Sequence, residues 1–223
     1  MAITRIITPA VNDDAVTLAK MASGTDGNII SYDASGNPVA VATGNDGQVL
    51  TSAGAGAPPV FETLPVGGIT EADWWRITTE FTGSAVPIGS NWERCDTANF
   101  GKIGTGVSQS SGIFSFPSTG VWQMLAQQGM YFNGSIRYAR LDLETTVDNA
   151  SNWVTSGSRY SFINNVSGNT YSGMNCNIIF NCSNISTHKF RMSITKESSG
   201  VTTTANSGST QTGCMFIRLG DSV

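Results

Sequence analysis

The sequence predicts an all-β protein whose carboxy-terminal part is an antiparallel sandwich or barrel. Three observations predict this class: period-two strand patterns after residue 66, a glycine-rich repeat before them, and a charged fraction of only 13%. In soluble domains about a quarter of the residues are charged, so Ser, Thr, Asn and Gly must cover this surface. The composition divides the chain into a leading segment (1–22), a Gly/Ala-rich region (23–65) and a β domain (66–223).

The leading segment contains one helix signal. In NDDAVTLAKMASG, Asn12 or Asp13 can cap a short helix and Gly24 can end it. A helix of this length is not stable alone, so it must dock on sister chains or on a larger particle. The segment lacks a basic stretch followed by a long apolar core, so we expect no secretory signal. The side chains expected to anchor it are apolar: Ile3, Ile6, Ile7, Val16 and Leu18.

The Gly/Ala-rich region contains an internal repeat. GTDGNIISYDASGNPVAVAT begins at Gly24, and GNDGQVLTSAGAGAPPVFET begins at Gly44, an offset of 20 residues. Asp-Gly pairs favour tight turns, and each copy has the pattern of a turn, a strand, a turn and a second strand. A single hairpin buries too little surface to fold alone. We therefore expect an extended shaft in which several chains pack together; the alternative is a flexible linker.

The β domain alternates apolar and polar residues. In MNCNIIFN, Cys176 and Ile178 share one face and Asn175 and Asn177 the other. Such alternation, interrupted by polar turns, predicts half-buried antiparallel strands. The candidate strands are WWRITTEF, WERC, GIFSFP, GVWQMLAQQGMYF, IRYARLDLET, SRYSFI, MNCNIIFN, HKFRMSI and GCMFIRL.

Two of these strand patterns are apolar on both faces. Trp122 and Met124 alternate with Val121 and Leu125, and GCMFIRL is apolar almost throughout. One face of each strand can pack in the core of the sandwich, and the other must be covered by something else. This pattern predicts a subunit interface.

Residues that could carry catalysis or bind metal are few and scattered. His188 is the only histidine and lies in an apolar strand pattern, so we expect a structural role. Asp142, Glu144 and Asp148 form a loose acidic stretch without a calcium-loop signature, and we expect the first two to be solvated. We therefore predict neither a catalytic site, a metal nor a cofactor. The cysteines show no metal-ligand spacing, and we expect four free core thiols: Cys95, Cys176, Cys182 and Cys214.

Two loops offer the best candidates for ligand binding. TTVDNASNWVTSGS holds Trp153 beside Asp148 and Asn149, and NNVSGNTYSG holds Tyr171. An exposed ring can stack on a sugar while polar neighbours bind its hydroxyl groups. Alternatively, these rings pack on neighbouring loops or across a seam between subunits.

Charge and hydropathy exclude two classes of partner. The net charge is −4 and Lys and Arg form no basic run, whereas affinity for nucleic acid requires the neutralisation of several phosphates. No stretch reaches the ~20 apolar residues of a spanning helix. We expect neither nucleic-acid binding nor membrane insertion.

Two segments before residue 64 resemble bacteriophage fibre proteins. DDAVTLAK is similar to their AVT-x-AK stretch, and GNDGQVLTSAGAGAPPVF to their G-x-x-G-Q-V-L-T-S-x-G-A-G-A-x-P stretch, which precede a distal domain. The second motif matches at Gly44, Gly47, Gln48, Val49, Leu50, Thr51, Ser52, Gly54, Ala55, Gly56, Ala57 and Pro59. The resemblance implies a structural protein of a virion.

The β domain resembles the tumour necrosis factor and complement globular-head family. GIFSFPSTGVW is similar to the family's G-x-F-x-x-P-x-x-G-x-Y signature, and TGCMFIRL to its closing strand. The matching positions are Gly112, Phe114, Pro117, Gly120, Trp122 in place of the usual Tyr, and Gly213. The resemblance implies a jelly roll of about ten strands that assembles as a tight homotrimer, although the first strand matches only in part.

Together these features lead us to expect a non-enzymatic trimeric fibre of a bacteriophage head or tail, assembled in the host cytoplasm. Its leading segment would anchor it to capsid or tail proteins, and its distal knob would bind a host surface glycan. The alternative is a capsid decoration protein without receptor binding. A jelly-roll carbohydrate-active enzyme would need two carboxylates about 5–10 Å apart, and the sequence offers no clear pair.

Overall fold

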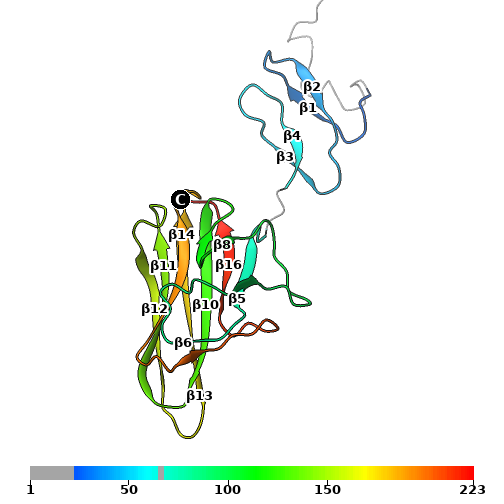
Figure 1. The fold of residues 1–223 in the computed structure, drawn as a ribbon. Coiled ribbons are helices and arrows are strands. Elements are labelled where there is room, and N and C mark those ends of the chain that lie inside the picture. The colour runs from blue at the N-terminus through cyan, green and yellow to red at the C-terminus, as the bar shows by residue number, and fades with distance from the viewer. Residues whose placement is uncertain (1–22, 65–67) are drawn as a thin grey trace, which may run out of the picture. The chain divides into compact units, whose positions relative to one another are not determined.

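A computed structural model describes residues 23–64 and 68–223 (Figure 1). The chain divides into two compact units, one ending at Gly67 and one starting at Gly68. All regular elements within the described ranges are β-strands. These residues form no helix long and apolar enough to cross a membrane. The helix and the anchoring side chains expected in residues 1–22 lie outside the described residues.

Each sequence repeat forms one antiparallel hairpin. β1 (Ile29–Tyr32) pairs with β2 (Pro38–Val41), and β3 (Gln48–Thr51) pairs with β4 (Val60–Thr63). Equivalent glycines share a left-handed backbone conformation, which glycine adopts without steric strain: φ is +77° and +81° at Gly27 and Gly47, and +78° and +81° at Gly36 and Gly56. The repeated glycines therefore set equivalent turns.

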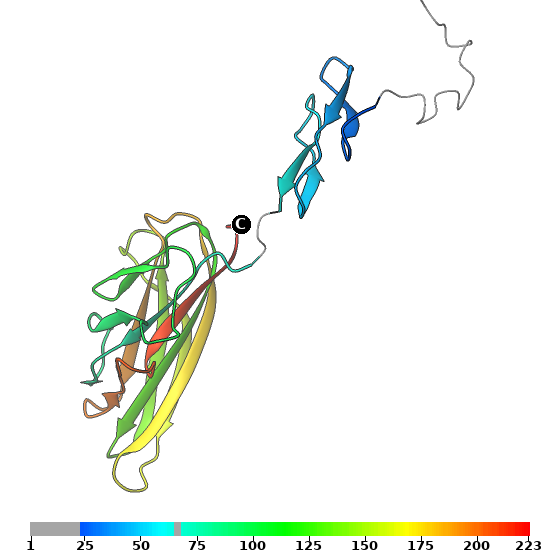
Figure 2. The ribbon, with the colours of Figure 1, turned by 90° about the vertical axis from the view of Figure 1, so that its right-hand side faces the viewer.

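The unit from Gly68 is a sandwich of two antiparallel sheets (Figures 1 and 2). The seven-stranded sheet contains β5 (Ala72–Ile77), β6 (Phe81–Thr82), β7 (Trp92–Arg94), β10 (Gly120–Phe132), β13 (Thr170–Cys182), β15 (Thr202–Thr203) and β16 (Gly213–Gly220). The five-stranded sheet contains β8 (Ser108–Ser110), β9 (Ile113–Ser115), β11 (Ile136–Thr146), β12 (Val154–Ile163) and β14 (Lys189–Lys196).

The strand order is that of a jelly roll. The main strands of one sheet lie in the order β5-β16-β10-β13, and those of the other in the order β9-β14-β11-β12. If these strands are counted along the chain, the two sheets read 1-8-3-6 and 2-7-4-5, which is the arrangement of two interlocked Greek keys. The expected jelly roll is confirmed. The unit has twelve strands rather than about ten, because the short strands β6, β7, β8 and β15 add to the main eight.

The observed strand boundaries agree best with those predicted from the sequence where the strand is apolar. β10 spans the expected residues 120–132, whereas β12 and β13 each begin four residues earlier than their apolar patterns do. Their extensions, VTSG and TYSG, lack a continuous apolar alternation, and backbone pairing with β11 and β10 holds them in the sheets. Pairing between distant segments does not require an apolar side chain.

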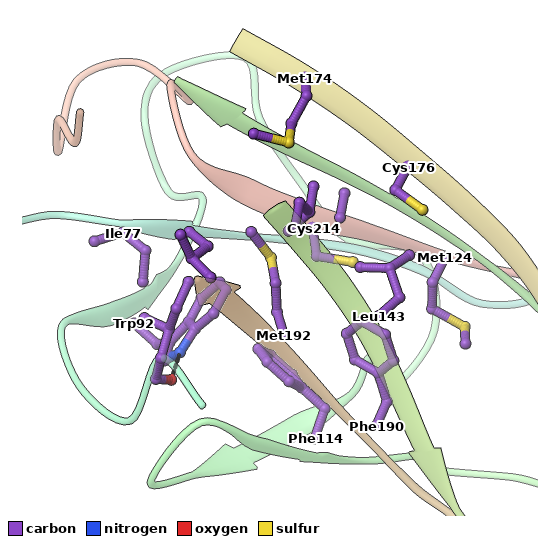
Figure 3. Packing of buried hydrophobic residues seen from close by; sticks show 14 of the residues in the cluster. Ile77, Trp92, Phe114, Met124, Leu143, Met174, Cys176, Phe190, Met192 and Cys214 are labelled. Carbon is purple, nitrogen blue, oxygen red and sulfur yellow. Dashed lines mark hydrogen bonds between the residues drawn. The ribbon is translucent and has the colours of Figure 1, made fainter. Parts of the chain in front are cut away.

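The core between the sheets is aromatic around Phe114 (Figure 3). Its fully buried ring lies with its centre 5.0 Å from those of Trp92 and Phe216. The four cysteines, all within residues 68–223, are free and buried, as expected. Burial raises the pKa of the Cys214 thiol well above its usual value. These thiols therefore stay protonated and act as small apolar core residues.

Lys196 is a cation on the core side of β14. Its side chain is buried, and its Nζ donates a hydrogen bond to the carbonyl oxygen of Val201 at 2.9 Å. The same Nζ lies 4.9 Å from the centre of the Phe81 ring. Burial lowers the pKa of Lys196 to about 8, because the charged form loses its hydration.

The lowered pKa of Lys196 predicts that the free energy of unfolding changes with pH in the alkaline range. An unfolded lysine has a pKa of about 10.4, so the unfolded chain binds more protons between about pH 8 and pH 10. The free energy of unfolding should therefore rise across this window and be insensitive to this group below it. We expect the variant Lys196→Met to have a higher melting temperature than the wild type near pH 7. Its free energy of unfolding should lack the increase that Lys196 causes across this window. Calorimetry of both proteins near pH 7 and pH 10 tests this; equal pH dependence would contradict it.

Candidate interaction surfaces

The outward side of the seven-stranded sheet presents an apolar surface, which we call the open face. It consists of the outward-pointing apolar side chains of β5, β10, β13 and β16: Trp74, Val121, Leu125, Ile179, Met215, Ile217 and Leu219. Leu125 stands at its centre, paired in register with Met215 of β16 and Asn177 of β13. Ile179 and Leu219 are 67% and 52% exposed. This is the second apolar face that the sequence predicted for β10 and β16.

The open face is hollowed at its centre. A cavity of about 300 Å³ is lined by Trp74, Leu125 and Met215 together with the amide side chains of Gln127, Asn175 and Asn177. Asn175 and Asn177 come from the polar side of the β13 alternation, and Gln127 comes from β10, where it is paired in register with Asn175. Apolar side chains around a few hydrogen-bonding groups are typical of the centre of a protein interface.

The loop between β11 and β12 holds Trp153. The guanidinium carbon of Arg191 lies 4.3 Å from the centre of the Trp153 ring and covers one of its faces. Glu144 in turn binds Arg191 through both carboxylate oxygens, at 3.0 and 3.1 Å. One face of the ring is therefore occupied by a fixed cation from a neighbouring strand.

Asp148 holds the same loop together. Its carboxylate accepts hydrogen bonds from the Thr146 hydroxyl at 2.6 Å and from the backbone and side-chain amides of Asn152 at 2.9 and 2.7 Å. These bonds lower the pKa of Asp148 to about 2. Asn149 has a left-handed φ of +58°, and its backbone N–H donates to the Thr187 carbonyl. Both residues shape the loop, and their role in ligand binding stays a prediction.

Tyr171 lies at the opposite end of the sandwich from Trp153. The loop of Trp153 precedes β12, whereas residues 164–169 follow β12 and lead into β13, which begins beside Tyr171. Tyr171 is 68% exposed, and its ring centre lies 5.2 Å from that of Tyr131 on β10. The structure therefore brings Trp153, Asp148 and Asn149 together and separates Tyr171 from them. Tyr171 borders the open face, since Tyr131 and Leu125 point to the same side of β10.

The acidic residues of β11 are not solvated as expected. Asp142 is buried; it accepts a hydrogen bond from Ser158 at 2.7 Å and pairs with Arg140 at 2.7 Å. Glu144 is held by Arg191. Strand pairing supplies these cations and hydroxyl groups from β11, β12 and β14, which the local sequence does not show. In residues 23–64 and 68–223 no three acidic, Cys or His side chains gather as metal ligands.

His188 has the structural role expected for it. It is buried immediately before β14, and its ring nitrogens lie 3.2 Å from the Ser183 hydroxyl and 3.0 Å from the Thr187 hydroxyl. Its ring also packs against Phe180, with centres 5.6 Å apart. These contacts satisfy both nitrogens within the fold.

The strand order defines a jelly-roll protein. The open face gives its seven-stranded sheet an apolar outward side. No protein family and no curated protein matches the sequence. Among solved structures it is similar to murine APRIL at pH 5.0, with a TM-score of 0.48 and 10% identity over 67% of this chain and 98% of that chain. It is also similar to murine APRIL at pH 8.5 (TM-score 0.43, 11% identity, 67% and 98% covered) and to Eiger TNF from S. frugiperda (0.47, 10%, 70% and 96%).

Proposed function

We propose that this chain is a non-enzymatic structural protein of a bacteriophage virion, a homotrimeric head or tail fibre. The open face carries the proposal. Its exposed apolar side chains span β10, β13 and β16, and contact with sister chains would remove them from water. In a closed three-fold arrangement the open face of each chain contacts its two neighbours. No interface is then left unpaired to add further chains without limit.

The repeat unit supports the same assembly. Ile30, Tyr32 and Leu50 are exposed on its two hairpins, although each is an apolar or aromatic residue on a short strand. Hairpins of four-residue strands have little core of their own and gain stability from neighbours. In a trimer, three copies would pack side by side as a shaft, and residues 1–22 would attach it to capsid or tail proteins.

Light scattering of the purified full-length chain tests the assembly. We expect a mass of three chains at micromolar concentration. A stable monomer would contradict the proposal.

Deletion of residues 1–22 tests the division of labour between anchor and knob. We expect the truncated protein to remain folded and trimeric but to be absent from assembled particles, because Ile3, Ile6, Ile7, Val16 and Leu18 are lost with the segment. The measurement is the amount of the chain in purified virions, with the full-length protein as control. Normal incorporation of the truncated chain would place the anchor elsewhere.

A knob that faces outwards is suited to host attachment. β5 begins opposite the end of β16, so the chain enters the sandwich at the end that holds the Trp153 loop. The turn formed by residues 164–169 lies at the other end. If particles that lack this protein assemble normally and still attach to cells, a capsid decoration role is favoured instead.

A further inference from the structure

The five-stranded sheet has an aromatic cluster on its outward side. We call Tyr138 of β11 and Tyr160 and Phe162 of β12 the aromatic patch. Tyr160 and Phe162 are 63% and 65% exposed, and Tyr138 meets Tyr160 edge to face with ring centres 6.4 Å apart. The sequence did not predict this patch, because IRYARLDLET and SRYSFI are ordinary strand patterns and do not show which strands lie side by side.

Charged side chains of this sheet face are paired with one another. Arg140 pairs with Asp142 at 2.7 Å, and Arg191 with Glu144 at 3.0 Å. The aromatic patch is therefore a small group of three rings beside paired charges. A stable protein interface needs roughly 20–30 residues on each side, so the patch matches a smaller ligand.

A shallow cavity of about 730 Å³ adjoins Phe162. Its polar lining comes from Ser135, Arg137, Asn164, Glu197 and Ser198. The backbone N–H of Arg137 donates to Glu197 Oε2 at 2.6 Å, and the guanidinium of Arg137 pairs with the other carboxylate oxygen. The Glu197 backbone N–H donates to the Tyr138 carbonyl at 3.2 Å. These bonds fix a hydrogen-bonding wall beside an exposed ring.

We propose that this cavity and the aromatic patch bind a pyranose ring of a bacterial surface polysaccharide. The apolar C–H face of the sugar would stack on Phe162, and its hydroxyl groups would bond to Asn164, Ser135 and Arg137. The Arg137–Glu197 pair carries no net charge, which favours a neutral sugar over an anionic one. The proposal deepens the proposed function by locating attachment away from the Trp153 loop.

The position of the patch is compatible with the proposed trimer. It lies on the five-stranded sheet, whereas the open face belongs to the seven-stranded sheet. Phe162 is next to the last residue of β12, so the site lies toward the end of the sandwich opposite the point where β5 begins. Three copies would remain free in the trimer and could act together, so weak individual sites would give strong attachment.

An array of purified bacterial lipopolysaccharides and capsular polysaccharides tests the inference. The full-length wild type is compared with Phe162→Ala and with Val154→Ala, which alters a residue at the other end of β12 that is 64% exposed. We expect binding of the wild type to at least one neutral polysaccharide, a loss of about tenfold or more in Phe162→Ala, and no change in Val154→Ala. Arg137→Ala should weaken binding to the same polysaccharide.

Light scattering of the same samples separates the two proposals. Trimers that bind no polysaccharide, or that bind equally well as Phe162→Ala, overturn the sugar site and leave the fibre assembly standing. Sugar binding by monomers that depends on Phe162 supports the site and contradicts the trimer. Binding only to anionic polysaccharides overturns the assignment to a neutral sugar.

Discussion

The variant Leu125→Asp is expected to convert the trimer into folded monomers. Leu125 lies at the centre of the open face, between Met215 and Asn177 in the registers of β16 and β13. In a trimer through this face, three carboxylates would be removed from water close to one another. Burial of unpaired charge is strongly unfavourable, whereas in a monomer the same side chain would be solvated, since Leu125 is partly exposed.

Light scattering at micromolar concentration should therefore report one chain for Leu125→Asp and three for the wild type. The matched control is Val154→Asp, which introduces the same charge at an exposed position of the five-stranded sheet and should remain trimeric. Circular dichroism should show the β content of both variants unchanged. A trimeric Leu125→Asp would show that the open face is not the interface.

Phe114→Ala is expected to lower the free energy of unfolding by about 3–5 kcal/mol. The ring of Phe114 is fully buried and packs against Trp92, Phe190 and Phe216, with centres 5.0–5.9 Å apart. These partners belong to both sheets, so the substitution would leave a cavity between the two layers. The lost apolar burial and the lost aromatic contacts act in the same direction.

Denaturant unfolding of Phe114→Ala and Phe162→Ala measures this effect. The two substitutions remove the same atoms, but Phe162 is exposed, so its loss should change the free energy of unfolding by less than about 0.5 kcal/mol. Equal effects of the two variants would place Phe114 outside the core. Both measurements belong in reducing buffer, which keeps the four buried thiols of the chain free.

The sequence by itself determined which side chains of a strand share a face. Cys176 and Met174 are buried while Asn175 and Asn177 point outwards, as the alternation predicted, because successive side chains of a strand point to opposite sides. The same rule identified Val121 and Leu125 as a second apolar face of β10. The repeated glycines at Gly27 and Gly47 likewise marked equivalent turns, because a left-handed backbone favours glycine at those points.

Only the tertiary structure decided which faces and loops lie together. β10, β13 and β16 are neighbours in one sheet although they are far apart in the sequence, and their pairing joins separate apolar stripes into the open face. It also covers Trp153 with Arg191, separates it from Tyr171, and gathers Tyr138 and Phe162 beside Glu197. Local periodicity specifies the faces of each strand but not its partners, since strand order follows from contacts between distant segments.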